Sequence, residues 1–189
     1  MSIPALVQAF WGHEAFKWDP HQGFRLASGA ISPYYIDCRG LLAHPGSRWL
    51  VAELAFSLIH NLAIQAVGGL EIGAIPLGTS ISDYAYTAKP SQTLRTFVVR
   101  KQAKDHGLGK KIEGAIQPKD RTLIVDDVLT SGGSLIKAIH AAREAGLIVN
   151  HALVIVDREE QDGKRLVEKE GVTVLRLLTL EDLKTAKPQ

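Results

Sequence analysis

The sequence is poor in the features that mark secreted or membrane-spanning proteins. It contains one cysteine, Cys38, so no internal disulfide can form, which fits a reducing compartment. No apolar run reaches the ~20 residues that a membrane span needs, and Glu53 interrupts the run from Trp49 to Ile59. No basic stretch precedes an apolar one near the N-terminus, as it would in a secretory signal. We therefore expect a cytoplasmic protein that does not bind a membrane.

The numbers of basic and acidic residues are nearly equal. The 22 basic and 20 acidic residues leave a net charge of +2, which indicates no particular partner and gives no sign of nucleic-acid binding. The histidines lack His-x-x-x-His spacing and no Cys-x-x-Cys pair is present, so we expect no structural zinc site. Repeats, low-complexity tracts and Pro/Gly/Ser-rich linkers are absent as well. The 189 residues fit one domain, long enough to bury a core without disulfides or metals.

The spacing of apolar residues predicts helices and strands that alternate along most of the chain. Leucines four residues apart between positions 50 and 62, for example, are typical of an amphipathic helix. Helices are expected over residues 4–16, 47–62, a stretch after 76, 134–145 and 164–170. Strands are expected over residues 24–26, 34–36, 66–69, 94–99, 122–128, 147–156 and 172–177. Such alternation predicts an α/β fold with a central parallel sheet flanked by helices.

In a parallel sheet, ligands bind at the carboxyl ends of the strands. There the chain places Asp126 and Asp127, then hydroxyl residues and two glycines, before the next helix begins. Backbone N–H groups in such a loop and at a helix N-terminus suit a phosphate dianion. The carboxylates would repel a bare polyphosphate, but they can accept hydrogen bonds from sugar hydroxyls or hold a metal ion. A pentose 5-phosphate offers both partners; an acidic strand end before an ordinary helix cap is the alternative.

A second candidate segment, residues 100–114, is cationic and contains glycines, so we expect a loop rather than packed structure. Arg100, Lys101, Lys104 and His106 could together neutralise a pyrophosphate leaving group. The alternatives are a solvated basic loop or a nucleic-acid contact. No aromatic residue is interleaved with the charges, which counts against binding of single strands.

The segment from Leu123 to Ser134 resembles the motif with which type I phosphoribosyltransferases bind phosphoribosyl pyrophosphate (PRPP). The resemblance implies that Asp126 and Asp127 bind the ribose hydroxyls and that the loop after them wraps the 5-phosphate. The PRPP-binding residues that it implies are Arg100, Lys101, Lys104, His106, Asp126, Asp127, Val128, Leu129, Thr130, Ser131, Gly132, Gly133 and Ser134. It implies catalytic roles for Lys101, Lys104, His106 and Asp127.

The residues Arg-Lys-Gln-Ala-Lys-Asp-His-Gly at 100–107 resemble the catalytic loop of orotate phosphoribosyltransferases. This resemblance implies a homodimer in which the loop of each chain closes over the site of its partner. Arg100, Lys104 and His106 would contact pyrophosphate, and Lys101 would reach across from the other chain. Hypoxanthine, adenine and uracil enzymes of the superfamily lack this pattern.

Two further segments resemble the base site of the same family. Residues 26–37 resemble part of the hood that covers the base in this family. The resemblance implies one domain, residues 1–189, in which about residues 1–40 and the C-terminal end form this hood. Arg158 aligns with the arginine that holds the orotate carboxylate, a task suited to a bidentate guanidinium. The implied orotate-binding residues are Tyr35, Ile36, Thr130 and Arg158. The chain departs from many members at Ala27 and from some at Gly73, where they carry lysine.

The resemblance as a whole implies the type I phosphoribosyltransferase fold and a Mg2+-dependent transfer. Orotate and PRPP would give orotidine 5'-phosphate and pyrophosphate, a step of de novo pyrimidine (UMP) biosynthesis. The Mg2+ would be held mainly through PRPP, not by a protein-only site. A transferase for another base and a PRPP-sensing regulator that binds nucleic acid are the other functions to weigh.

Overall fold

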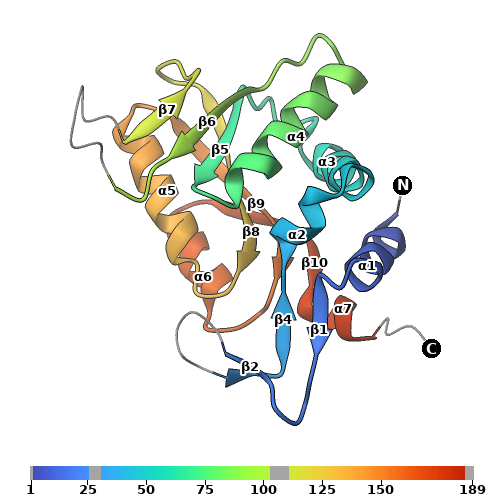
Figure 1. Cartoon of the computed structure of the whole chain (residues 1–189). Coiled ribbons are helices and arrows are strands. Elements are labelled where there is room, and N and C mark those ends of the chain that lie inside the picture. Colours follow the sequence, from blue (N-terminus) through green and yellow to red (C-terminus); the bar gives the residue numbers. More distant parts are fainter. Residues whose placement is uncertain (1, 26–30, 103–110, 186–189) are drawn as a thin grey trace.

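The computed structural model describes residues 2–25, 31–102 and 111–185, and its centre is a sheet of six strands (Figure 1). The strands are β5 (Ala66–Leu70), β6 (Arg95–Val99), β7 (Ile112–Gly114), β8 (Arg121–Leu129), β9 (Ile148–Asp157) and β10 (Thr173–Thr179). They lie in the order β10-β9-β8-β5-β6-β7. Neighbouring strands are parallel except for β6 and β7, which are antiparallel. The predicted α/β fold with a mostly parallel sheet is confirmed.

Helices cover both faces of this sheet, because its strands carry apolar side chains on both sides (Figure 1). The covering helices are α3 (Pro45–Ile59), α4 (Ala74–Ala88), α5 (Gly133–Glu144) and α6 (Gly163–Glu168). In β8, Leu123 and Val125 belong to the core shared with α3 and α4, whereas Ile124 belongs to the core shared with α5. This period of two residues is expected for a strand that is buried on both faces.

The part of the chain before α3 adds two small antiparallel sheets beside the central one. Its elements are α1 (Ile3–Gly12), β1 (Phe16–Trp18), β2 (Phe24–Arg25), β3 (Ile31–Ser32), β4 (Tyr34–Ile36) and α2 (Cys38–Ala43). Strand β1 pairs with β4, and β2 pairs with β3. The last helix, α7 (Leu180–Thr185), packs against α1, and the indole Nε1 of Trp11 donates to the carbonyl oxygen of Leu183 at 3.1 Å.

The helix predicted over residues 4–16 is shorter than expected. It ends at Gly12, and the chain then turns through Glu14, whose φ of 53° lies in the left-handed region. The N–H of Ala15 donates to the carbonyl oxygen of Phe10 at 2.8 Å, which closes the turn. Phe16, which the helical spacing placed in the helix, therefore begins β1.

The other predicted helices and strands are present, with ends that differ by a few residues. The helix expected after position 76, for instance, begins at Ala74. The short elements β1, β3, β7, α2 and α7 were not predicted. Among the described residues, no helix combines the length and the apolarity that a membrane crossing requires.

Candidate functional site

The carboxyl ends of β8 and β9 lie side by side and bring two of the predicted segments together. In this parallel pair, Asp126 lies opposite Val154, and Leu129 lies opposite Asp157. Directly after β9, the backbone N–H of Arg158 donates to the carbonyl oxygen of Leu129 at 2.9 Å. The acidic pair and Arg158 are therefore at the same edge of the sheet.

A cavity of about 310 Å³ opens at this edge; we call it the main cavity. It is lined by Ile36, Asp37, Cys38, Arg39, Leu70, Glu71, Ile72, Gly73, Lys101, Asp126, Asp127, Val128, Ser134 and Arg158. The predicted site residues among them are Ile36, Lys101, Asp126, Asp127, Val128, Ser134 and Arg158. The predicted charged residues Asp126, Asp127, Lys101 and Arg158 come from separate parts of the chain and thus line one cavity.

The turn from β8 into α5 encloses a second cavity of about 230 Å³, which we call the loop cavity. It is lined by Asp126, Val128, Leu129, Thr130, Ser131, Gly132, Gly133, Ser134 and Leu135. Gly132, with a φ of 78°, is in the left-handed conformation that favours glycine, and α5 begins at the next residue. The N–H groups in the first turn of a helix have no helical partner and can bind an anion. This geometry is suited to a phosphate group.

Asp126 and Asp127 are held by successive backbone groups. The N–H of Asp127 donates to Oδ1 of Asp126 at 3.0 Å, and the N–H of Val128 donates to Oδ1 of Asp127 at 2.9 Å. Loss of hydration on burial raises the pKa of Asp126 to about 8, and the negative charge of Asp127 adds to the rise. A bound cation would therefore stabilise the ionised pair, and so would ligand hydroxyls that donate hydrogen bonds.

Gly73, directly before α4, lies against the carboxylate of Asp127. A Cβ atom at position 73 would lie 2.7 Å from Cγ of Asp127, closer than non-bonded carbon atoms approach. The φ of Gly73 is −59°, which any residue adopts, so the constraint is space and not backbone conformation. A lysine at this position would require the carboxylate of Asp127 to move.

Arg158 is one of the few charged residues that the fold buries, with 7% of its surface exposed. Its Nε and Nη2 donate to the two carboxylate oxygens of Glu160 at 3.0 and 3.1 Å. Nη2 also donates to the hydroxyl oxygen of Ser32, in β3, at 3.1 Å. The guanidinium is thus fixed between the sheet edge and the N-terminal part of the chain.

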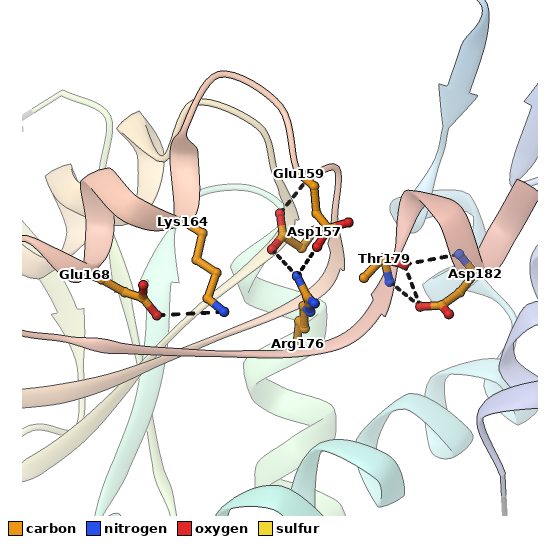
Figure 2. A network of polar contacts seen from close by, with 7 residues as sticks. All are labelled: Asp157, Glu159, Lys164, Glu168, Arg176, Thr179 and Asp182. Atoms are coloured by element: carbon orange, nitrogen blue, oxygen red, sulfur yellow. Dashed lines mark hydrogen bonds and ion pairs between the residues drawn. The ribbon is translucent and has the colours of Figure 1, made fainter.

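A second arginine holds the turn that follows β9, as Figure 2 shows. Nη1 of Arg176, in β10, lies 2.9 Å from Oδ2 of Asp157 and 2.7 Å from Oε1 of Glu159. The N–H of Glu159 donates to Oδ1 of Asp157 at 2.9 Å. Asp157 is 1% exposed, so this ion pair is largely shielded from water on one side. The backbone on both sides of Arg158 is therefore anchored.

The start of the basic loop, residues 100–114, reaches the main cavity through Lys101. Its backbone N–H donates to Oε1 of Glu71 at 2.8 Å. Arg100 does not line this cavity, and its Nη1 pairs with Oε1 of Glu113 at 3.0 Å. Lys104 and His106, which were also predicted for the site, lie outside the described residues.

The predicted base-binding residues lie in different places. Ile36 lines the main cavity beside Arg158, and Thr130 lines the loop cavity. Tyr35 lines neither of these two cavities. Its ring centroid lies 5.8 Å from that of Phe24, and 37% of the residue is exposed.

Several lining residues had no role assigned from the sequence. Asp37 is the N-cap of α2 and accepts from the N–H of Gly40 at 2.9 Å, and aspartate is a common N-cap residue that the sequence could have indicated. Cys38 is buried, with its Sγ 3.7 Å from the carbonyl oxygen of Asp127. Burial raises the pKa of the Cys38 thiol, and the charge of Asp127 adds to this effect. The thiol is therefore a poor nucleophile in this position.

Among the described residues, no three histidine, cysteine, aspartate or glutamate side chains cluster as a metal site would require. Asp126 and Asp127 offer carboxylate oxygens of the kind that Mg2+ prefers. A Mg2+ ion beside them would need further oxygen ligands, such as those of a bound phosphate.

Comparison with known proteins agrees with these features. Residues 39–179 match the family model of the phosphoribosyl transferase domain. The chain is similar to the orotate phosphoribosyltransferase of Aquifex aeolicus (strain VF5), with 37% identity over 160 residues that cover 85% of this chain and 86% of that protein.

Solved structures of the same kind of enzyme are also similar. For the orotate phosphoribosyltransferase of Mycobacterium tuberculosis H37Rv in complex with Fe(III) dicitrate, the TM-score is 0.82 and the identity 31%, over 96% of this chain and 98% of that chain. For the same enzyme in complex with PRPP, the TM-score is 0.69 and the identity 32%, over 78% of this chain and 82% of that chain.

Proposed function

This chain belongs to the orotate phosphoribosyltransferases of the phosphoribosyl transferase family, and we propose that the main cavity and the loop cavity bind the two substrates of that reaction. The reaction joins orotate to the ribose of PRPP, gives orotidine 5'-phosphate and pyrophosphate, and belongs to pyrimidine biosynthesis. The observation that carries the assignment of substrates to cavities is that Asp126, Asp127 and Arg158 line one space.

PRPP would lie across both cavities. The 5-phosphate fits the loop cavity, where Thr130 to Ser134 provide backbone N–H groups and hydroxyls at the N-terminus of α5. Asp126 and Asp127 border the main cavity and can accept hydrogen bonds from the ribose hydroxyls. A structure of the M. tuberculosis enzyme with PRPP supports this choice of ligand.

Orotate would lie in the main cavity with its carboxylate against Arg158. A buried guanidinium can form charge-assisted hydrogen bonds with a carboxylate, and water competes little at such a site. Ile36 provides an apolar wall and backbone groups beside the base. Tyr35 and Thr130 complete the set that the family resemblance implies for the pyrimidine.

Mg2+ is the cofactor that we propose, held by PRPP oxygens next to Asp126 and Asp127. The residues fit, since hard carboxylate oxygens suit this ion. Burial, and after it the charge of Asp127, raises the pKa of Asp126, and a cation would stabilise the ionised form of that carboxyl. When bound, Mg2+ would offset the negative charge that develops on the departing pyrophosphate.

The side chains of the protein would stabilise the charges that develop during the reaction and would position orotate. As the bond between ribose and pyrophosphate lengthens, the ribose carbon becomes positively charged, and the carboxylate of Asp127 can stabilise that charge. Lys101, Lys104 and His106 would bind the pyrophosphate as its negative charge grows. Arg158 would hold orotate so that its ring nitrogen faces the ribose carbon.

The active unit that we propose is a homodimer in which Lys101 serves the cavity of its own chain, which it lines, and the part of the basic loop that carries Lys104 and His106 serves the site of the partner. The loop is too polar to pack in the core of its own chain, and the family resemblance is what implies its crossover to the partner. We further propose that residues 1–40 and the C-terminal end form a hood over the base. A cytoplasmic location fits a chain with one cysteine.

A spectrophotometric assay of orotate consumption tests the proposal. We expect consumption to require both PRPP and a divalent metal, and to stop when the metal is chelated. Uracil should be a poor substitute, because it lacks the carboxylate that Arg158 would bind. Equal turnover of uracil, or turnover of a purine in place of orotate, would contradict the proposed substrate.

A further inference from the structure

The carboxylate of Glu160 holds one edge of the Arg158 guanidinium. Nε donates to Oε2 at 3.0 Å and Nη2 donates to Oε1 at 3.1 Å, so the pair is bidentate. Nη2 donates in addition to the hydroxyl oxygen of Ser32 at 3.1 Å. Together these contacts fix both the position and the rotation of the guanidinium plane.

The same contacts leave part of the guanidinium for a ligand. Within the described residues, the hydrogen bonds of the Arg158 side chain use Nε and Nη2. Nη1 carries two more N–H groups, and Arg158 lines the main cavity together with Asp126 and Asp127. A guanidinium fixed in this way needs no reorientation when a carboxylate binds, which reduces the entropic cost of binding.

Glu160 reaches Arg158 from outside the main cavity. It does not line that cavity, but lines a separate groove of about 340 Å³ together with Lys164 and Glu168. A carboxylate that competed with the substrate for Arg158 would have to lie inside the main cavity. The position of Glu160 is therefore that of a support for Arg158.

Arg176 holds the turn that precedes Glu160 by binding Asp157 and Glu159 (Figure 2). Glu159 has a φ of 54°, a left-handed conformation that is unfavourable for glutamate unless other contacts hold it. Its N–H bonds to Asp157 and its carboxylate pairs with Arg176, at 2.9 and 2.7 Å. The side chains of Asp157 and Glu159 thus bind Arg176, while the side chain of Glu160 binds Arg158.

We propose that Glu160 is a positioning residue for the carboxylate-bearing substrate. It holds Arg158 in the orientation that presents Nη1 to the substrate carboxylate. Without Glu160, the guanidinium could turn toward Asp126 and Asp127 in the same cavity. The inference rests on the proposed function, because it assumes that Arg158 binds the orotate carboxylate.

Steady-state kinetics of Glu160→Gln test the proposal, with Glu168→Gln as the matched control. Glutamine keeps the shape of Glu160 but loses the charge. Glu168 lines the same groove and pairs with Lys164 at 3.9 Å, away from Arg158. For both variants and the wild type, KM is measured for orotate and for PRPP, together with kcat and the midpoint of thermal unfolding. Binding of uracil is measured as competitive inhibition.

We expect Glu160→Gln to raise the KM for orotate roughly tenfold, because a small loss of alignment at a charged contact is costly. The KM for PRPP and the inhibition constant of uracil should change less than about twofold, since neither depends on a carboxylate of the base. Glu160→Asp keeps the charge but is shorter, so its KM for orotate should be intermediate. Glu168→Gln should behave as the wild type.

Four results would overturn the inference. An unchanged KM for orotate would show that Glu160 does not position Arg158, and a lower one would show that it competes with the substrate. An equal loss of affinity for orotate, uracil and PRPP would show a role in folding. If the wild type itself consumed no orotate, the proposed function would fail and this inference with it. An active wild type with an unaffected Glu160→Gln variant would refute only the inference.

Discussion

The backbone N–H of Arg158 lies 2.9 Å from the carbonyl oxygen of Leu129. Leu129 is the last residue of β8 and precedes the loop that is suited to phosphate, while Arg158 is the residue that we propose for the orotate carboxylate. The spacing between the two proposed substrate sites is thus fixed in part by main-chain hydrogen bonding at the edge of the sheet.

Replacing Arg158 with alanine should weaken orotate binding and leave PRPP binding nearly intact. Loss of a buried charge-assisted pair costs about 2–4 kcal/mol, which corresponds to a rise in Kd of roughly 30- to 800-fold. Calorimetric titration of each substrate separately measures the two effects. If the Kd for PRPP rose as much as that for orotate, Arg158 would belong to the phosphate site or to folding.

Mixing two inactive variants should restore activity if the basic loops are shared between subunits. One variant is Lys104→Ala, because Lys101 lines the cavity of its own chain, and the other combines Asp126→Asn with Asp127→Asn. A mixed dimer then has one site with both lesions and one site with neither, so random reassortment of equal amounts should restore about one quarter of the wild-type activity. Subunit exchange is checked with differently tagged chains. Exchange without recovered activity would show that each chain uses its own loop.

The stability of the ligand-free protein should fall as the pH rises from about 4 to about 8. Burial raises the pKa of Asp126 from 3.8 to about 8, so in this range the folded chain holds a proton that the unfolded chain has lost. The free energy of unfolding therefore decreases with increasing pH, and the contribution of this proton is gone above the folded-state pKa. Asp126→Asn should remove this dependence.

Thermal unfolding midpoints of wild type and Asp126→Asn, recorded between about pH 5 and about pH 9, measure this effect. The variant should become more stable relative to the wild type as the pH increases. Midpoints that ran parallel for the two proteins would contradict the shift in pKa.

Gly73→Ala should weaken PRPP binding while the fold stays stable. The added Cβ would lie 2.7 Å from Cγ of Asp127 and would push its carboxylate away from the backbone. Gly78→Ala is the matched control, since a Cβ there, in α4, would lie an ordinary 3.7 Å from its nearest neighbour, the carbonyl oxygen of Val67. We expect a higher KM for PRPP in Gly73→Ala and an unchanged one in Gly78→Ala. Equal kinetics for both variants would show that the close approach of Gly73 to Asp127 does not affect PRPP binding.

The parts of the site that lie in one continuous stretch could be predicted from the sequence. Asp126, Asp127 and the loop after them carry their chemistry in their order along the chain, and a strand followed by glycines and a helix indicates the geometry. Contacts between distant residues could not be predicted in this way. The bond of Arg158 to Ser32 joins residues 126 positions apart, and the approach of Gly73 to Asp127 depends on how two strands are packed.

The errors in the predicted elements have specific causes. Apolar residues continue at near-helical spacing to Phe16, so the pattern could not indicate the left-handed residue Glu14 that ends the turn after α1. Strand β7 is too short for a period of two residues to be recognised. Helix α7 did carry a signal, because Thr179 and Asp182 form reciprocal hydrogen bonds of the kind that caps a helix N-terminus.

The hydrogen bond from Trp11 to Leu183 has a consequence for how the chain matures on the ribosome. Helix α1 is synthesised well before α7, and the two helices pack against each other (Figure 1). Strands β5 to β10 and the helices between them can assemble while translation continues, because domains form from the segments that have already emerged. Helix α1 also packs against α3 and β1, so only the side of it that contacts α7 stays uncovered until α7 is made. The packing of α1 is therefore completed only when α7 has been synthesised.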